Sequence, residues 1–160
     1  MDFKELLKQF DHLPKFPDGR INYSNADTAV VLNCFVKFGD EILLLKRSDK
    51  VNAYKGKWNS IGGYLDEPVS LRKKVLEELR EELGIITNIK SLSTAEPHTL
   101  VDKAINKTWI IFPVLVELSK KPEITLDWEH TDFVWIKPEQ INDYDVVPDV
   151  PFLLKRVLKR

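Results

Sequence analysis

The segment from Ser70 to Gly84 constrains the fold more than any other part of the chain. Its apolar residues recur every four positions: Leu71, Val75, Leu79 and Leu83. This spacing places them on one stripe of an amphipathic helix. Ser70 is a favoured N-cap residue, and glycine commonly follows the last turn of a helix. The sequence therefore predicts a helix over residues 70–83 that buries one face and ends at Gly84.

Segments typical of β-strands lie on both sides of this helix. Residues 28–38 are β-branched and largely apolar, and the turn at Gly39-Asp40 leads into a second apolar run, so a hairpin is expected. Further strands are predicted after the helix, at 85–89, 108–118 and 133–136, and short helices at 2–10 and 150–159. Strands that bracket a central helix, with helices at both ends, indicate a mixed α/β layered domain.

Length, charge and cysteine content exclude several classes of protein. The 160 residues suit one domain, 1–160, in which 1–25 form an N-terminal helix and a turn-rich extension. A formal net charge of -1 provides no field for nonspecific nucleic-acid binding. The single cysteine, Cys34, excludes a disulfide framework. No apolar run approaches the roughly 20 residues of a membrane span, and the N-terminus is unlike a secretory signal. We therefore expect a cytoplasmic protein without nucleic-acid or membrane partners.

Four glutamates fall within six residues of the predicted helix: Glu77, Glu78, Glu81 and Glu82. Glu81 and Glu82 follow Glu78 by three and four positions, so these three carboxylates project from one face. Like charges at this spacing repel by a few tenths of a kcal/mol each, and a hard divalent cation would remove the repulsion. The alternative is a solvated face neutralised by nearby basic residues: Lys73, Lys74 and Arg80.

The sequence around these glutamates resembles the Nudix box. Residues 62–85, GGYLDEPVSLRKKVLEELREELGI, are similar to the pattern G-x5-E-x7-R-E-U-x-E-E-x-G-U, in which U is aliphatic. Counted from Gly63, the residues that match in register are Glu78, Leu79, Glu81, Glu82, Gly84 and Ile85. The flanking segments also fit, so the resemblance covers roughly residues 27–138.

This resemblance implies a fold, a cofactor and a reaction. The fold would be a Nudix-like α/β/α sandwich with a mixed β-sheet. The reaction would be Mg²⁺-dependent hydrolysis of a phosphoanhydride bond in a nucleotide or nucleoside-diphosphate derivative, with Mn²⁺ as a substitute. The implied metal-binding residues are Gly63, Glu78, Glu81 and Glu82. Glu81 or Glu82 could also help to deprotonate the attacking water, and Glu129 is a further candidate for the base because some family members carry a loop glutamate near this place.

Two positions depart from the box. Val69 stands where the pattern has glutamate, and Glu77 stands where it has an arginine that helps to orient the metal-binding glutamates. The departures favour a slow enzyme, and they keep open an alternative, a Nudix-fold module that binds a nucleotide without turnover. Candidates for the missing carboxylate are Asp66 and Glu67, and candidates for the missing guanidinium are Lys73 and Arg80.

The predicted substrate-binding residues are Arg47, Lys57 and Trp58. Arg47 ends a strand expected to point toward the cleft, and its guanidinium can hold phosphate oxygens with two hydrogen bonds. Lys57 could also meet phosphate, and Trp58 could stack on a base, although surface charge and core packing are the alternatives. Packing or surface roles are expected for two single histidines, His98 and His130. The expected partner is a small-molecule nucleotide, and dimerisation, common in the family, stays open here, as does the identity of the substrate.

Overall fold

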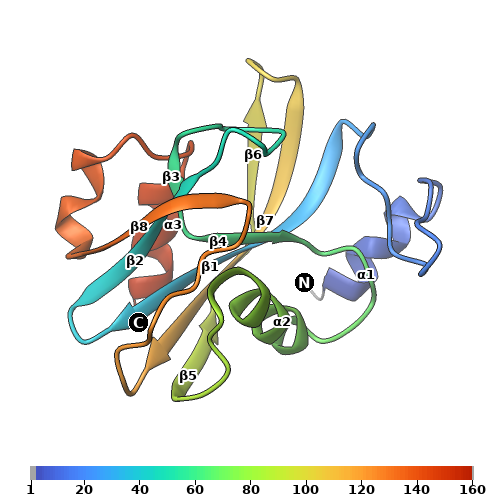
Figure 1. Cartoon of the computed structure of the whole chain (residues 1–160). Helices are drawn as coiled ribbons and strands as arrows, with labels where there is room; N and C mark the ends of the chain where they lie inside the picture. The colour runs from blue at the N-terminus through green and yellow to red at the C-terminus, as the bar shows by residue number, and fades with distance from the viewer. Residues whose placement is uncertain (1–2, 160) are drawn as a thin grey trace.

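The computed structural model describes residues 3–159 (Figure 1). The helical elements are α1 (Phe3–Leu7), the 3-10 helix η1 (Lys8–Phe10), α2 (Leu71–Leu83), the 3-10 helix η2 (Pro138–Asp143) and α3 (Val150–Leu158). The strands are β1 (Thr28–Phe38), β2 (Glu41–Arg47), β3 (Trp58–Asn59), β4 (Ile61–Tyr64), β5 (Ile89–Thr94), β6 (His98–Asp102), β7 (Lys107–Leu118) and β8 (His130–Ile136).

One mixed sheet holds all the described strands. Its main order is β3-β2-β1-β7-β5, with β4 paired to β1, β6 to β7 and β8 to β2. β1 and β7 run parallel from Thr28–Thr108 to Phe38–Leu118, and the other strand pairings are antiparallel. The predicted mixed sheet is therefore confirmed.

The predicted hairpin forms, but only beside its turn. β1 pairs with β2 at Lys37–Ile42 and Phe38–Glu41. Farther along, β4 lies antiparallel to β1, from Val31–Tyr64 to Cys34–Ile61. This pairing places the two glycines of β4 beside β1, at Leu32 and Asn33, shortly before the loop that leads into α2.

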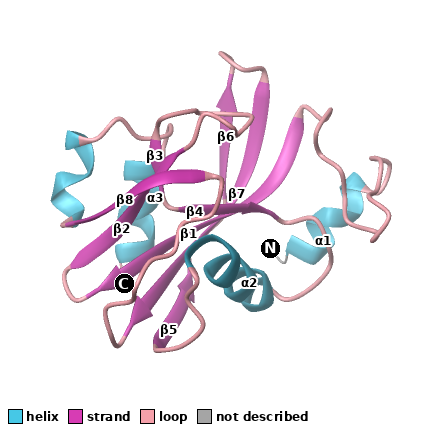
Figure 2. Ribbon diagram, in the orientation of Figure 1, coloured by secondary structure: helices cyan, strands magenta, loops and turns pink. Residues whose placement is uncertain are grey.

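Helices cover both faces of the sheet, as Figure 2 shows by element type. On one face, α1 and α2 pack against β1 through a cluster that includes Val75, Leu79 and Leu32. On the other face, α3 packs through Leu153 against Phe35. In Figure 1, α2 lies in front of the sheet and α3 behind it. The arrangement is the α/β/α sandwich predicted from the sequence.

The boundaries of α2 follow the predicted caps. The backbone N–H of Lys73 donates to Ser70 Oγ at 3.1 Å. At the other end, Gly84 has φ 72°, and the N–H of Ile85 reaches back to Leu79 O at 3.1 Å. The Gly84 N–H also donates to Arg80 O at 3.0 Å, and a left-handed residue with this bond is the αL cap, for which glycine is suited because it lacks Cβ.

The predicted strand at 85–89 is wrong. The chain enters β5 only at Ile89, and Asn88 adopts a left-handed φ of 65°. Ile85 is buried because it closes the helix cap against the core, while Ile86 is 75% exposed. The apolar residues that suggested a strand therefore serve a helix terminus and a turn. Residue 2 of the predicted N-terminal helix lies outside the described residues, and residues 3–10 form α1 and η1.

Within residues 3–159, no helix has both the length and the apolar character that crossing a membrane requires.

Candidate metal centre and active site

The final two turns of α2 present the three predicted carboxylates at different depths. Glu82 is 2% exposed and Glu78 is partly buried, whereas the side chain of Glu81 is 60% exposed. Burial raises the pKa of Glu78, and the nearby Lys74 ammonium acts in the opposite direction. The acidic face of α2 is therefore buried at Glu82 and exposed to solvent at Glu81.

Glu82 is the most unusual of these groups. Both of its carboxylate oxygens are buried and have no hydrogen-bond partner among the described residues. Burial, reinforced by the neighbouring carboxylate of Glu78, raises the pKa of Glu82 well above its ordinary value. A buried polar group without a partner costs several kcal/mol, roughly 2–7 by transfer measurements. A hard divalent cation would supply the missing partner, and its preference for carboxylate oxygens fits this site.

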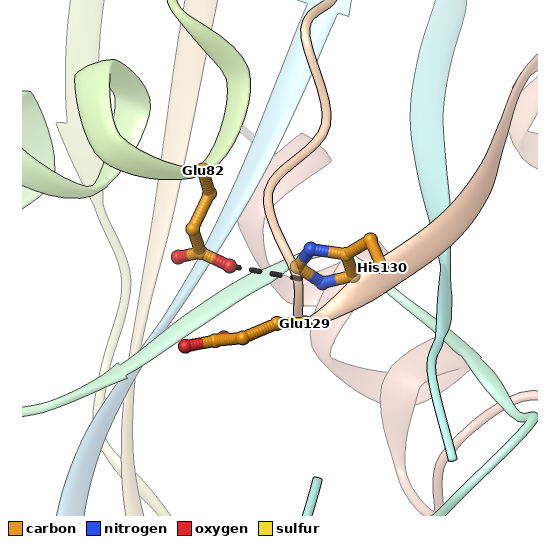
Figure 3. A group of neighbouring side chains, drawn as sticks. All are labelled: Glu82, Glu129 and His130. Atoms are coloured by element: carbon orange, nitrogen blue, oxygen red, sulfur yellow. Dashed lines mark ion pairs between the residues drawn. The ribbon is translucent and has the colours of Figure 1, made fainter. Parts of the chain in front are cut away.

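A strand from the other side of the site completes the cluster (Figure 3). Glu82 projects from α2, while Glu129 and His130 lie at the start of β8. One ligand atom from each of these three residues lies within 4.8 Å of the other two. That spacing is compatible with ligands around one ion, so the cluster brings predicted metal-binding and catalytic residues together from distant parts of the sequence.

His130 is buried and held in one orientation. Its Nδ1 lies 3.2 Å from Asp127 Oδ1, and its Nε2 lies 3.7 Å from Glu82 Oε1. Burial lowers the pKa of His130, which favours the neutral ring at pH 7. The contact with the Asp127 carboxylate assigns the ring proton to Nδ1, so the Nε2 lone pair faces Glu82. Sequence reasoning gave His130 a packing or surface role, because no motif connected it with the helix.

Glu129 has the properties of a proton acceptor near neutral pH. Burial raises its pKa to about 7, with further contributions from Asp127 and Glu78, while Arg47 opposes the shift. A catalytic base works best when its pKa lies near the operating pH. The structure thus places the predicted base beside both the carboxylates of α2 and a guanidinium.

Arg47 reaches this site through an irregularity in the sheet. The β2–β8 register shifts where the pair Lys46–Asp132 is followed by Arg47–His130, and such bulges often re-aim side chains near active sites. Its Nε donates to Ala53 O at 2.9 Å, which uses one of five N–H donors. Burial lowers the pKa of Arg47, and Glu129 and Glu82 oppose that change, so both carboxylates lie within electrostatic reach.

Lys57 and Trp58 face another part of the molecule. Lys57 Nζ pairs with Asp145 Oδ1 at 2.9 Å, and Trp58 packs edge-on against Tyr144 at 5.4 Å between ring centroids. Both partners belong to the segment between η2 and α3. Among the described residues, no recorded contact joins Lys57 or Trp58 to the carboxylate cluster, so their role in substrate binding stays a prediction.

Gly63 lies where an added side chain would meet the carboxylate of Glu78. A Cβ built on it would stand 2.6 Å from Glu78 Oε1 and 2.7 Å from Glu78 Cδ. The glycine therefore permits close approach of β4 to the metal-binding face of α2. Gly63 therefore lies next to Glu78, another of the four predicted metal-binding residues, and its role in binding a metal stays a prediction.

Comparison with known families connects these features to a known class. Residues 25–156 match the family model described as the NUDIX domain. The nucleoside triphosphatase NudI of Escherichia fergusonii is 28% identical over 110 residues, which cover 65% of this chain and 78% of that relative. NudI of Escherichia coli strain SE11 is 26% identical over the same shares of both chains.

Two solved structures share the fold. The MutT NUDIX hydrolase from Burkholderia pseudomallei superposes with a TM-score of 0.65 at 22% identity, covering 81% of this chain and 98% of that one. The NUDIX domain of Shewanella oneidensis NrtR, complexed with ADP ribose, superposes with a TM-score of 0.68 at 17% identity, covering 98% and 96%. At these identities the likeness shows the fold.

Proposed function

The chain belongs to the NUDIX domain family, as a pyrophosphohydrolase of the Nudix type, and we propose that it uses Mg²⁺ to hydrolyse a nucleotide. The bond cleaved is a phosphoanhydride in a nucleoside triphosphate or a nucleoside-diphosphate derivative. The NudI relatives are named nucleoside triphosphatases. The structural neighbour from Shewanella oneidensis is complexed with ADP ribose, which is a nucleoside-diphosphate derivative. Mn²⁺ is the expected substitute metal.

The observation that carries this proposal is the pair of unpartnered oxygens on buried Glu82, beside Glu129. The ligand set proposed for the ion is Gly63, Glu78, Glu81 and Glu82. Mg²⁺ bound there would supply positive charge to phosphate oxygens and would make water more acidic. In an ordinary core, a buried carboxylate without a hydrogen-bond partner lowers stability and adds no packing. Its presence here therefore favours a functional role.

The chain's own residues provide the remaining chemistry. Glu129 accepts a proton from the attacking water as the water oxygen bonds to phosphorus and the anhydride P–O bond breaks. His130, fixed by Asp127, limits the movement of Glu82 on the buried side of the site. Arg47, anchored through Nε, directs its remaining N–H donors toward phosphate oxygens, whose developing charge it stabilises.

The test measures phosphate and pyrophosphate release with Mg²⁺ across a panel of nucleoside triphosphates and nucleoside-diphosphate derivatives. Glu82→Gln should nearly abolish turnover while the chain stays folded, because the amide removes the buried anionic ligand. Glu139→Gln makes the same substitution at an exposed residue of η2 and should retain activity. Full activity in Glu82→Gln, or in excess EDTA, would overturn the metal mechanism. Nucleotide binding without any release would instead identify a binding module.

A further inference from the structure

Lys74 is buried on the catalytic helix. It is 2% exposed, and it is the one lysine or arginine within residues 3–159 that is buried. Removal of an ammonium from water costs several kcal/mol unless opposite charges and hydrogen bonds compensate it. The partners of Lys74 therefore decide whether α2 can keep a cation at this position.

The loop before α2 supplies these partners. Lys74 Nζ lies 2.7 Å from Asp66 Oδ1 and 3.7 Å from Glu67 Oε1. A second cation continues the network, because Arg20 Nε contacts Glu67 Oε2 at 3.0 Å and Arg20 Nη2 lies 4.0 Å from Glu77 Oε2. Arg20 Nε also lies 3.6 Å from Asp18 Oδ2, so two positive and four negative side chains connect the N-terminal segment, the loop and the helix.

The network lies close to the two departures from the Nudix box. Val69 and Glu77 are eight residues apart, and Asp66 and Lys74 have the same separation three residues earlier. Three residues are nearly one helical turn. A carboxylate on the loop and a cation on the helix are therefore both present, displaced by three residues from the positions of the pattern.

The cations are not those suggested by the sequence. Lys73 and Arg80 are exposed, and the recorded ion pair of Arg80 is with Glu81, at 3.8 Å. The acidic candidates, Asp66 and Glu67, do take part in the network. The sequence suggested Lys74 only as a surface counter-charge in the alternative interpretation of the acidic face, because its inward orientation depends on how the loop folds.

The N-terminal segment holds this loop in place. The Ile21 N–H donates to Asp66 O at 2.9 Å, and the Tyr23 hydroxyl donates to Leu65 O at 2.8 Å. With Arg20, these residues precede position 25, where the match to the family model begins. The contacts that hold this loop therefore come from a part of the chain that lies before the matched domain.

We propose that Lys74 is a positioning residue for the metal centre, held by Asp66 and Glu67 and braced by Arg20. It lies four residues before Glu78, which lies four before Glu82, so all three share one face of α2. The fixed ammonium acts electrostatically on the Glu78 carboxylate, and Arg20 offsets the charge of Glu77 at 4.0 Å. This inference rests on the proposed function, since it assumes that Glu78 binds a cation.

The direct test is the affinity of the full chain for Mn²⁺ alone, measured by titration calorimetry in wild type and Lys74→Met. On charge alone, removal of an ammonium near a cation site strengthens cation binding by reducing repulsion. A positioning role predicts the opposite effect. The affinity for Mn²⁺ should fall roughly 10–100-fold, as it does for other residues that orient metal ligands. Lys73→Met removes the same charge from the exposed neighbouring residue and should not weaken binding.

A second variant covers the case in which Lys74→Met does not fold. Asp66→Asn combined with Lys74→Met removes the buried pair together, so no unpaired buried charge from that pair is left. The folded double variant should still bind Mn²⁺ more weakly than wild type. Wild-type or tighter binding in either folded variant overturns the positioning role while leaving the proposed function intact. A wild type that binds no Mn²⁺ overturns both, and one that binds Mn²⁺ without hydrolysing nucleotides overturns only the function.

Discussion

Replacement of Gly63 by alanine should damage the active site with little effect on the fold. The added Cβ would stand 2.6 Å from Glu78 Oε1, whereas ordinary contact begins at 3.4 Å. The carboxylate must therefore retreat by about 0.8 Å, the difference between these distances. Gly63 has no left-handed φ, so the backbone itself accepts alanine.

The expected losses of stability and of activity differ in size. Moving one side chain away from its preferred rotamer costs about 0.5–1.5 kcal/mol, which lowers the melting temperature of a chain this long by about 1–6 °C. A misplacement of about 1 Å in a catalytic site can reduce the rate by about 100-fold. We expect Gly63→Ala to show a loss of kcat of that order and weaker Mg²⁺ binding.

Gly62→Ala is the matched control. Its Cβ would lie 3.7 Å from Leu32 O, an ordinary contact, and it adds the same methyl group to the same strand. Steady-state kinetics and thermal unfolding give kcat and the melting temperature of both variants for comparison. Full activity in Gly63→Ala, or equal losses in the two variants, would refute the argument that Gly63 makes room for Glu78.

Three further predictions concern titration and burial. Glu129→Gln should lower kcat with little change in melting temperature, because it removes the proposed base beside the carboxylate cluster; an unchanged kcat would place the base elsewhere. The metal-free chain should lose stability as pH rises from the ordinary glutamate value toward 7, since Glu129 and Glu82 bind protons more tightly folded than unfolded; urea titrations across pH would contradict this if stability increased. The Cys34 thiol is buried and its pKa is raised, so thiol reagents should label it only after unfolding, and rapid labelling of the native chain would show an opening at β1.

Local patterns were sufficient to predict α2 and the position of its glutamates. Its apolar stripe, serine cap and terminal glycine are all adjacent in sequence, and they act within the same few turns. The spacing of the box likewise indicated which carboxylates share a face. These predictions depend on short-range geometry, which the sequence displays directly.

The remaining parts depend on contacts between distant segments. Arg20 meets Glu77 only because the N-terminal segment folds against the loop before α2. His130 meets Glu82 only because β8 pairs with the end of β2. The short strands β3 and β4 are defined by their partners and are too brief for a period of two to be visible. No pattern within a single segment encodes such contacts.

The central claim is that a divalent cation binds between α2 and the start of β8. Anomalous diffraction from crystals of the full chain soaked in Mn²⁺ tests it most directly. The account predicts a Mn²⁺ peak in contact with the carboxylate of Glu82, near Glu78 and Glu129, and no such peak in Glu82→Gln. At saturating Mn²⁺, an empty site beside Glu82, with peaks only at other surface carboxylates, would contradict it.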